Sequence, residues 1–215
     1  MTLAAAGSLS PHGPAAREIA DLWWLMLGLG TAVFAVFLVA LIVGLARRAS
    51  TDRQAEAGQQ RWIVGAGVLA PLVILIVVLG YTVATMRALP EAGARAALVV
   101  EVTGHQWYWQ IRYPDTGVET VNDLRFPVGR PIEVRLRSAD VIHSFWVPEL
   151  AGKLDALPER TNTLVIQADE PAELTGRCAE FCGLDHATMN LSAVAQDPAE
   201  FEDWLLGQQA KAGPR

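Results

Sequence analysis

The sequence predicts an α+β membrane protein, in which a two-helix transmembrane hairpin is followed by a small all-β domain. Two uncharged apolar blocks, residues 22–46 and 62–86, account for the hairpin. From residue 98 onward the pattern changes to short β-rich runs separated by Pro, Gly, Asp and Asn. Because 52% of the residues are hydrophobic and many of them fall in the two blocks, the chain divides into a membrane part and an extramembrane part.

Each apolar block is long enough to cross a hydrocarbon core, which needs about 20 helical residues. Pro71 and the glycines inside the blocks are tolerated in transmembrane helices. The intervening loop, residues 47–61, carries four arginines and two acids, whereas the N-terminal tail, residues 1–21, has Arg17 as its single basic residue. By the positive-inside rule the loop is cytoplasmic, and both termini lie on the outer side. The first residues do not show the pattern of a cleavable signal peptide, so the first span is expected to act as the export signal.

After a linker at residues 87–97, the extramembrane domain is predicted at residues 98–207. Strands are expected at residues 98–103, 107–113, 132–137 and 161–167. Runs of this length and spacing are typical of a small antiparallel sandwich or Greek-key barrel. Asp197 and Pro198 are the cap and first residue of a short helix to about residue 206, whose apolar face is predicted to pack on the β domain. Residues 208–215 are expected to form a mobile tail.

Charge is distributed unevenly along the chain. Residues 1–97 hold seven basic and five acidic side chains, a net charge of +2, and residues 98–215 hold ten basic and eighteen acidic, a net charge of −8. An acidic domain attracts a basic partner, although dispersed charge also serves solubility alone. Nucleic-acid binding is not supported, because it requires a basic patch.

Residues 178–189 read CAEFCGLDHATM and contain the two cysteines of the chain, one of its four histidines and a methionine. Thiolate and thioether donors select soft metals, and His and Cys with a Met at the edge is the donor set of electron-transfer copper. A further histidine, His143, lies upstream in SADVIHSFWVP. A mononuclear blue-copper site needs one Cys, so the second thiolate suggests two metal ions bridged by Cys178 and Cys182.

Three simpler interpretations compete with copper. Cysteines four residues apart outside the cytosol often form a disulfide, although that leaves His186 and Met189 unexplained. A zinc site is also compatible with Cys and His, but Met is a poor zinc ligand. His143 on its own would be read as a packed histidine. Asp140, three residues before it, is a candidate to orient this histidine from behind.

Nearly the whole chain resembles subunit II of the haem-copper cytochrome c oxidases, through GHQWYW at residues 104–109, DVIHSFW at residues 140–146 and the cysteine cluster. The resemblance implies a cupredoxin domain with the dinuclear copper centre called CuA. The implied metal ligands are His143, Cys178, Cys182, His186, Met189 and the main-chain carbonyl of Glu180. It further implies that the Glu180 carboxylate helps to hold Mg or Mn at the interface with subunit I.

The resemblance also implies a function. Electrons from cytochrome c would enter near Trp107, pass through the copper pair and reach haem in subunit I, where oxygen is reduced to water with proton translocation. Subunit III would be a further partner, and the chain would lie in the bacterial inner membrane.

In a strand, Trp107 and Trp109 would face one side and Tyr108 the other, and Trp109 is expected to pack in the core.

Two departures from the family pattern appear. The start of the second apolar block, QRWIV at residues 60–64, lacks the acidic residue that some members use for proton entry. There is no Cys-x-x-Cys-His motif, so no fused cytochrome c domain is expected. The alternatives are a copper-bearing nitric oxide reductase subunit, a quinol-fed oxidase subunit, whose family members lack the copper ligands, and a membrane-anchored copper chaperone of thioredoxin-like fold.

Overall fold

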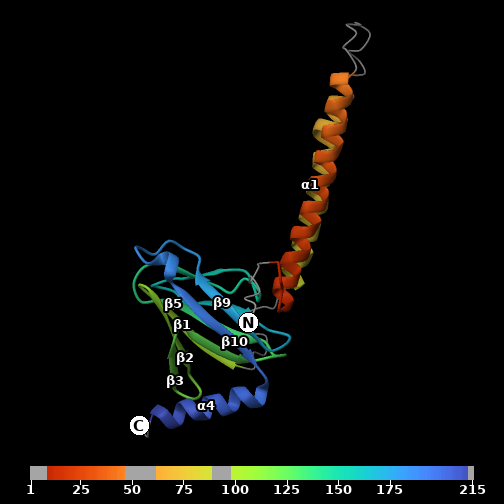
Figure 1. Cartoon of the computed structure of the whole chain (residues 1–215). Helices are drawn as coiled ribbons and strands as arrows, with labels where there is room; N and C mark the ends of the chain where they lie inside the picture. Colours follow the sequence, from red (N-terminus) through yellow and green to blue (C-terminus); the bar gives the residue numbers. More distant parts are fainter. Residues whose placement is uncertain (1–8, 47–61, 89–97, 213–215) are drawn as a thin grey trace. The chain divides into compact units, whose positions relative to one another are not determined.

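A computed structural model of the chain describes residues 9–46, 62–88 and 98–212 (Figure 1). The chain is divided into two compact units. One consists of Asp21–Ala88, and the other combines Met1–Ala20 with Leu89–Arg215. The predicted cytoplasmic loop at residues 47–61 and nearly all of the predicted linker, residues 89–97, lie outside the described residues.

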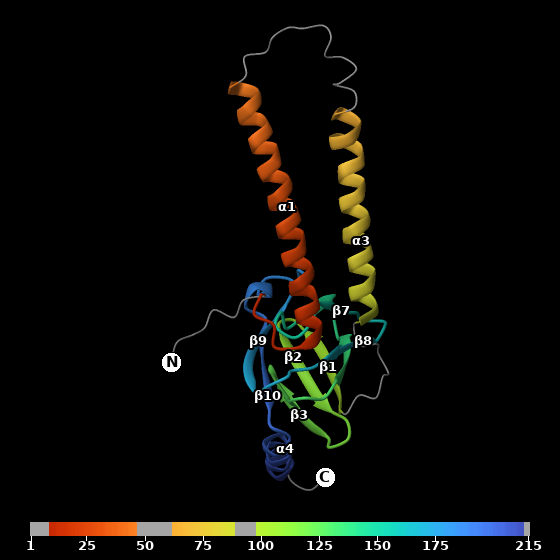
Figure 2. The same cartoon turned by 90° about the vertical axis from the view of Figure 1, so that its right-hand side faces the viewer.

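The membrane unit is built from two long apolar helices (Figure 2). The first, α1 (Pro14–Ala46), and the second, which spans Trp62–Arg87, are both long and apolar enough to cross a membrane. The second contains a π-helical segment, η2 (Gly65–Leu69), followed by α3 (Ala70–Ala88). None of the side chains in the most apolar stretch of either helix is buried within the protein, as expected for helices whose solvent is lipid. The prediction of two apolar helices followed by a β domain is confirmed.

Helix α1 begins at Pro14, earlier than the apolar block that starts at residue 22. Proline is favoured at the first position of a helix because it has no N–H to satisfy there. Part of the predicted N-terminal tail is therefore helical. The apolar stretch begins after Asp21, but the helix itself begins earlier and runs through this residue.

The β domain consists of two five-stranded sheets packed face to face (Figure 1). The first sheet has the order β3-β2-β1-β5-β8, formed by β1 (Leu98–His105), β2 (Tyr108–Tyr113), β3 (Val118–Val121), β5 (Ile132–Ser138) and β8 (Asn162–Ile166). The second has the order β4-β10-β9-β6-β7, formed by β4 (Asp123–Pro127), β6 (His143–Trp146), β7 (Leu154–Ala156), β9 (Ala172–Cys178) and β10 (Asn190–Gln196). All four strands predicted from the sequence are present.

The sheets are mixed rather than purely antiparallel. β1 pairs with β5 and β4 with β10 in parallel, while the other neighbouring strands pair antiparallel. Parallel neighbours arise because the chain crosses between the sheets before it returns, which local patterns do not reveal. Along β5 and β9 buried and accessible positions alternate, so one face of each sheet forms the core.

A terminal helix, α4 (Pro198–Ala212), packs on the domain through Phe201 and Trp204, as predicted. The Tyr113 ring lies 6.2 Å from Phe201 and 5.5 Å from Trp204, measured between ring centroids. The helix continues past residue 208, where a mobile tail was predicted. Gln, Ala and Lys, which fill residues 208–212, are good helix formers, so nothing ends the helix there.

The segment before the first span also belongs to the β domain unit, which the sequence did not predict. The His12 N–H donates to the Glu149 carbonyl at 2.8 Å, and the Asp169 N–H donates to the His12 carbonyl at 2.9 Å. A Cβ added to Gly13 would lie 2.0 Å from the Gln167 carbonyl oxygen, so the close approach requires glycine. Residues 9–20 are thus held against the domain by backbone hydrogen bonds.

Candidate metal centre

Two neighbouring strands bring the predicted ligand residues to one end of the second sheet. β6 begins with His143 and β9 ends with Cys178, and the two strands pair so that Phe145 lies opposite Cys178. The chain then turns through residues 179–188, including the short 3-10 helix η3 (His186–Thr188), before β10 starts at Asn190. His143, Cys178 and Cys182 are therefore neighbours although 39 positions separate the first from the last (143 to 182).

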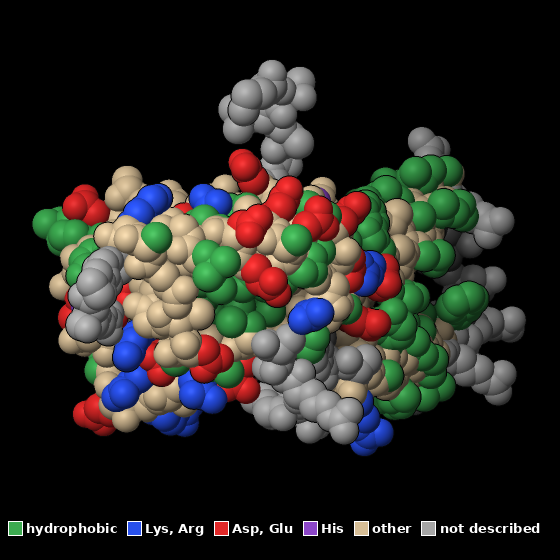
Figure 3. All heavy atoms as spheres, turned by 90° about the horizontal axis from the view of Figure 1, so that it is seen from below, with side chains coloured by type: hydrophobic (Ala, Val, Ile, Leu, Met, Phe, Trp, Pro, Cys, Tyr) green, Lys and Arg blue, Asp and Glu red, His purple; other side chains and the backbone are tan. Residues whose placement is uncertain are grey.

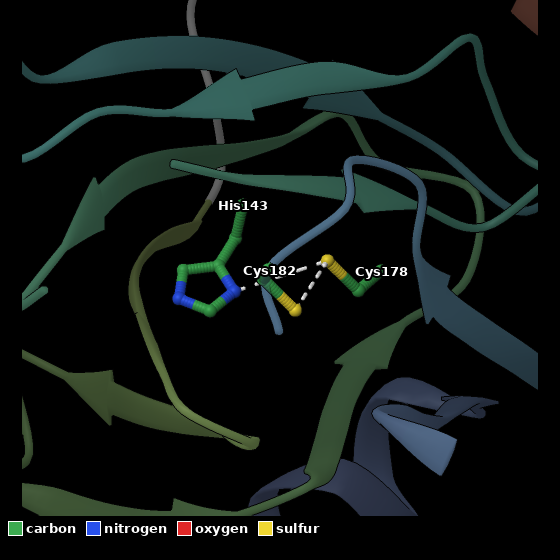
Figure 4. Close-up of side chains that lie close together, drawn as sticks. All are labelled: His143, Cys178 and Cys182. Atoms are coloured by element: carbon green, nitrogen blue, oxygen red, sulfur yellow. Dashed lines mark hydrogen bonds between the residues drawn. The ribbon is translucent and has the colours of Figure 1, made fainter. Parts of the chain in front are cut away.

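The potential donor atoms converge on one another. His143, Cys178 and Cys182 offer ligand atoms that all lie within 4.8 Å of each other, and all three side chains are buried (Figure 4). The Cys178 Sγ lies 3.8 Å from the His143 Nδ1 and 3.8 Å from the Cys182 Sγ. The nearby donors have the following separations: Cys182 Sγ to His186 Nδ1 3.6 Å, Cys182 Sγ to Met189 Sδ 3.7 Å, and Cys178 Sγ to the Glu180 carbonyl 3.2 Å. Each of the six predicted ligand positions thus places a donor atom within 3.8 Å of a cysteine sulfur.

The two cysteines are free thiols in this structure. Their sulfur separation of 3.8 Å is far longer than the roughly 2.05 Å of a disulfide bond. The thiols point toward the same space as the His143 nitrogen, as Figure 4 shows. This arrangement is suited to binding a metal and does not need a disulfide to hold it.

The two thiols differ in their acidity. Burial, together with the neighbouring Cys178 sulfur, raises the pKa of Cys182 to about 12. Burial also acts to raise the pKa of Cys178, but hydrogen bonds with His143 and with the backbone of Glu180 and Ser144 outweigh it and lower that pKa to about 6. Burial acts to lower the pKa of His143, yet its hydrogen bonds with Cys178 and Asp140 raise it. Cys178 is therefore the more acidic thiol of the pair, and a metal that binds both sulfurs as thiolates would displace the proton of Cys182.

The orientation of His143 is fixed from behind. Its Nε2 lies 2.7 Å from the Asp140 Oδ1, which leaves Nδ1 directed at Cys178. A carboxylate on the far nitrogen is how metal-binding histidines are commonly held. Gly104 packs against the ring, since a Cβ there would lie 2.8 Å from the imidazole. The proposed orienting role of Asp140 has the geometry it requires.

The two predicted roles of Glu180 belong to two chemical groups of the residue, its main-chain carbonyl and its side-chain carboxylate. Its carbonyl faces Cys178, while its side chain is 46% exposed and lies 3.5 Å from the Lys153 ammonium. Lys153 also approaches the Asp155 carboxylate at 3.9 Å. The carboxylate is thus accessible at the surface beside the site.

The aromatic residues 107–109 do not all lie in one strand, contrary to the sequence prediction. Strand β2 begins at Tyr108, so Trp107 lies in the turn after β1, where the Gln106–Trp107 peptide is cis. The half-buried Trp107 donates from Nε1 to the Cys182 carbonyl at 3.2 Å. Trp109 is fully buried against Phe145, as expected for a core residue.

One residue at the site was missed by sequence reasoning. Gln106 donates from its side-chain amide to the Cys182 carbonyl at 2.7 Å and from its backbone N–H to the Asp140 carboxylate at 2.7 Å. Its place in the run GHQWYW was noted, but no spacing rule connects it to a loop 76 residues later. A signal for it could only have come from three-dimensional contact.

The chemistry of the donors decides which metal fits. Two thiols, a thioether, two imidazoles and a carbonyl form a set rich in sulfur, which suits copper better than calcium or magnesium. Zinc would leave Met189 without a role, because zinc sites are closed by Cys, His and carboxylates. The residues present therefore fit a copper centre.

Comparison with known proteins assigns the chain to a family. Residues 116–196 match the family model described as cytochrome c oxidase subunit II, periplasmic domain. Cytochrome c oxidase subunit 2 of Alkalihalophilus pseudofirmus is 32% identical over 95% of this chain and 62% of its own length. Quinol oxidase subunit 2 of Bacillus spizizenii is 31% identical over 96% of this chain and 68% of its own length.

A solved structure shares the β domain. The crystal structure of the periplasmic domain of subunit II of cytochrome oxidase from Bradyrhizobium japonicum is 32% identical, with a TM-score of 0.54. The match covers 57% of this chain and all of that domain. The chain belongs to the subunit II family of the haem-copper oxidases. It spans less than two thirds of the length of the Alkalihalophilus relative.

Proposed function

We propose that the chain is the electron-transfer subunit of a respiratory cytochrome c oxidase. In this proposal it accepts electrons from cytochrome c at a dinuclear CuA centre and passes them to haem in subunit I, where oxygen is reduced to water with coupled proton translocation. The observation that carries the proposal is the convergence of His143, Cys178, Cys182, His186 and Met189 with the Glu180 carbonyl. The copper pair, when bound, would supply a one-electron carrier whose charge is shared over two ions and two thiolates.

The protein's own contribution is to hold the ligands in place before metal arrives. His143 is fixed by Asp140 and by the close contact with Gly104, and it starts a strand of the second sheet. Cys178 ends the neighbouring strand. Ligands attached to paired strands change position little between oxidation states, which favours fast electron transfer.

Trp107 is the proposed point of electron entry. It is half-buried, and its indole N–H donates directly to the carbonyl of Cys182, so a short bonded route leads from its ring to a ligand residue. The acidic domain would steer basic cytochrome c toward this end at a rate that falls with salt. Figure 3 shows the molecule from the α4 side, where several acidic side chains lie close together and the basic ones are scattered. The steering toward the metal end is therefore attributed to the net charge of residues 98–215, which is −8.

Two further partners belong to the proposal. The exposed Glu180 carboxylate would help to hold Mg or Mn at the interface with subunit I, with Lys153 leaving it to make room for the cation. Subunit III and the lipid bilayer would surround the two spans. The exposed apolar side chains of α1 and α3 suit both kinds of contact.

The proposed location is the bacterial inner membrane, with the loop at residues 47–61 cytoplasmic and the copper domain outside. The arginine content of the loop supports this orientation. The hydrogen bonds between His12 and the β domain give further support, because they require residues 9–20 and the domain to share one side of the membrane. An even number of spans has the same requirement.

A quinol oxidase subunit is the second candidate, since a relative of that name is 31% identical along nearly the whole chain. The ligand set argues against it, because a subunit without copper has no use for two buried thiols facing two histidines and a methionine. A nitric oxide reductase with the same copper centre is a third candidate, and subunits that copurify with the chain would distinguish it.

Copper loading of the full-length chain in detergent tests the proposal. We expect two copper ions per chain and an electron paramagnetic resonance spectrum in which one unpaired electron couples equally to both copper nuclei. A spectrum of isolated copper, or reduced protein that takes up no copper, would contradict it. Rapid reduction of the loaded chain by reduced cytochrome c, but not by quinol, would separate the first two candidates.

A further inference from the structure

The turn between β1 and β2 touches both segments that carry the ligands. Residues 139–143 lead into β6, and residues 179–189 connect β9 to β10. We propose that Gln106, in this turn, is a positioning residue that ties the two ligand segments together: its backbone holds the carboxylate behind His143, and its side chain holds Cys182. The inference rests on the proposed copper site and extends it to a residue outside the predicted set of metal ligands.

The first tie goes through the backbone. The Gln106 N–H donates to the Asp140 Oδ2 at 2.7 Å, while the other oxygen of the same carboxylate lies 2.7 Å from the His143 Nε2. A second bond, from the Ala139 N–H to the Gly104 carbonyl at 3.0 Å, joins the same two segments. Because both oxygens of Asp140 are bonded to different partners, the carboxylate cannot rotate without losing one of them. The turn, together with the Val141 N–H that donates to Oδ1 at 2.6 Å, therefore helps to set the direction in which the imidazole points.

The second tie goes through the side chain. The Gln106 amide nitrogen donates to the Cys182 carbonyl at 2.7 Å, and Trp107 donates to the same oxygen at 3.2 Å. The next residue, Gly183, has a φ of +119°. A Cβ at that position would lie 2.9 Å from the Gln106 amide nitrogen and 3.1 Å from the Trp107 ring. The loop thus carries glycine where the turn comes closest, so the carbonyl of Cys182 is exposed to both donors.

Packing does not explain the conformation of Gln106. The residue is exposed, so its side chain fills no cavity in the core. Its hydrogen bond to Cys182 is the shorter of the two that this carbonyl accepts. An exposed side chain that reaches over to a buried ligand residue fixes a loop at little cost in core packing. Its loss should change the geometry of the site while the fold persists.

Variants at residue 106 remove the side-chain tie and leave the backbone tie intact. Gln106→Leu has no donor, Gln106→Glu keeps the shape but turns an oxygen toward the carbonyl, and Gln106→Lys restores a donor at the end of a long side chain. The matched control is Gln209→Leu. Gln209 is also exposed and donates to a backbone carbonyl, that of Thr116 at 3.1 Å, but it lies on α4.

The measurements use the full-length chain in detergent. For the copper-loaded protein we expect Gln106→Leu and Gln106→Glu to release copper to a chelator roughly tenfold faster than the wild type, by analogy with losses of outer partners at metal sites. Their spectra should show unequal coupling to the two copper nuclei. Gln106→Lys should recover most of the wild-type rate and spectrum, and Gln209→Leu should match the wild type in both.

Amide hydrogen exchange in the metal-free protein measures the tie without copper. Gln106→Leu should raise exchange over residues 179–189 while exchange in the β strands stays as in the wild type. Wild-type exchange together with a wild-type copper spectrum in this variant would overturn the inference. If the wild type itself fails to form the copper pair, the proposed function fails, and the exchange result still decides whether Gln106 holds the loop.

Discussion

The two ends of the β domain are held together by different interactions. At the metal end, polar groups are buried and joined by directed hydrogen bonds, with His143 fully buried between Asp140 and Cys178. At the α4 end, aromatic rings pack together, with Tyr113 touching Phe201 and Trp204. Hydrogen bonds define geometry but add little net stability, whereas buried aromatic area adds much stability and tolerates small shifts. Changes at the first end should therefore alter the site, and changes at the second should alter the free energy of unfolding.

The largest effect is expected from Cys178→Ser. A hydroxyl is a poor ligand for copper, and the one remaining thiolate cannot supply both bridges of the proposed pair, so the dinuclear spectrum and electron transfer from cytochrome c should be lost entirely. The unfolding temperature of the metal-free protein should change little, because serine keeps a hydrogen-bonding hydroxyl in place of the thiol, whose partners are site residues and the Ser144 backbone.

Copper binding gives this prediction a second measurement. Saturating copper at about 1,000 times its dissociation constant stabilises the folded state by about 4 kcal/mol. Removal of copper with a chelator should accordingly lower the unfolding temperature of the loaded wild type and leave that of Cys178→Ser unchanged. Equal stabilisation of both proteins by copper would show that the metal binds elsewhere.

The next largest effect is expected from Phe201→Ala at the α4 end. The ring is 5% exposed, and removing a buried aromatic side chain costs about 3 to 5 kcal/mol. Denaturant unfolding should show this loss, while the copper spectrum stays that of the wild type. Leu206→Ala is the control, because this side chain on the same helix is 63% exposed and its removal should cost little. A changed copper spectrum in Phe201→Ala would break the separation between the two ends.

A smaller effect is expected from Asp140→Asn. The amide offers one acceptor oxygen in place of two, so either the Gln106 N–H or His143 loses its partner. Copper affinity should fall by about 10- to 100-fold, measured by competition with a chelator of known affinity. Asp203→Asn, on the exposed face of α4, is the control and should bind copper as the wild type does.

The smallest effect is expected from Glu149→Gln. Glu149 is 3% exposed, and its Oε2 has no hydrogen-bond partner within the described part of the chain. Burial raises the pKa of this carboxyl, although the charges of His12 and Arg177 act to lower it. A raised carboxyl pKa means that the folded state holds the proton more tightly than the unfolded chain does. Stability is then lost as the pH rises from the ordinary carboxyl pKa through the raised one.

The free energy of unfolding of Glu149→Gln should stay constant across this pH window, because glutamine does not titrate. At pH 7 the variant should be more stable than the wild type by about 1 kcal/mol. Urea unfolding of both proteins at a series of pH values measures the difference. Parallel curves for wild type and variant would mean that the carboxyl ionises equally well in the folded and unfolded states.

The sequence predicted the elements whose signal is local. Uncharged blocks predicted the two apolar helices, and short β-rich runs separated by Pro, Gly, Asp and Asn predicted β1, β2, β5 and β8. The donor set at residues 178–189 predicted a soft-metal site, because few other functions use thiols, imidazole and thioether so close together. Errors occurred at boundaries. α1 begins before its apolar block, and α4 continues past the predicted end, since helix propensity extends beyond the segments that polarity marks.

Sequence alone thus determined the donor side chains that the candidate metal centre offers and the two segments that are apolar enough to span a membrane, because residue type can be read directly along the chain. Tertiary structure alone decided that His143 faces Cys178, that residues 9–20 join the β domain, and that Gln106 reaches Cys182. These contacts join positions up to 157 residues apart (His12 to Asp169). Only the tertiary fold, through strand pairing, sheet packing and the docking of the segment before α1, brings such positions together, and no local pattern specifies that.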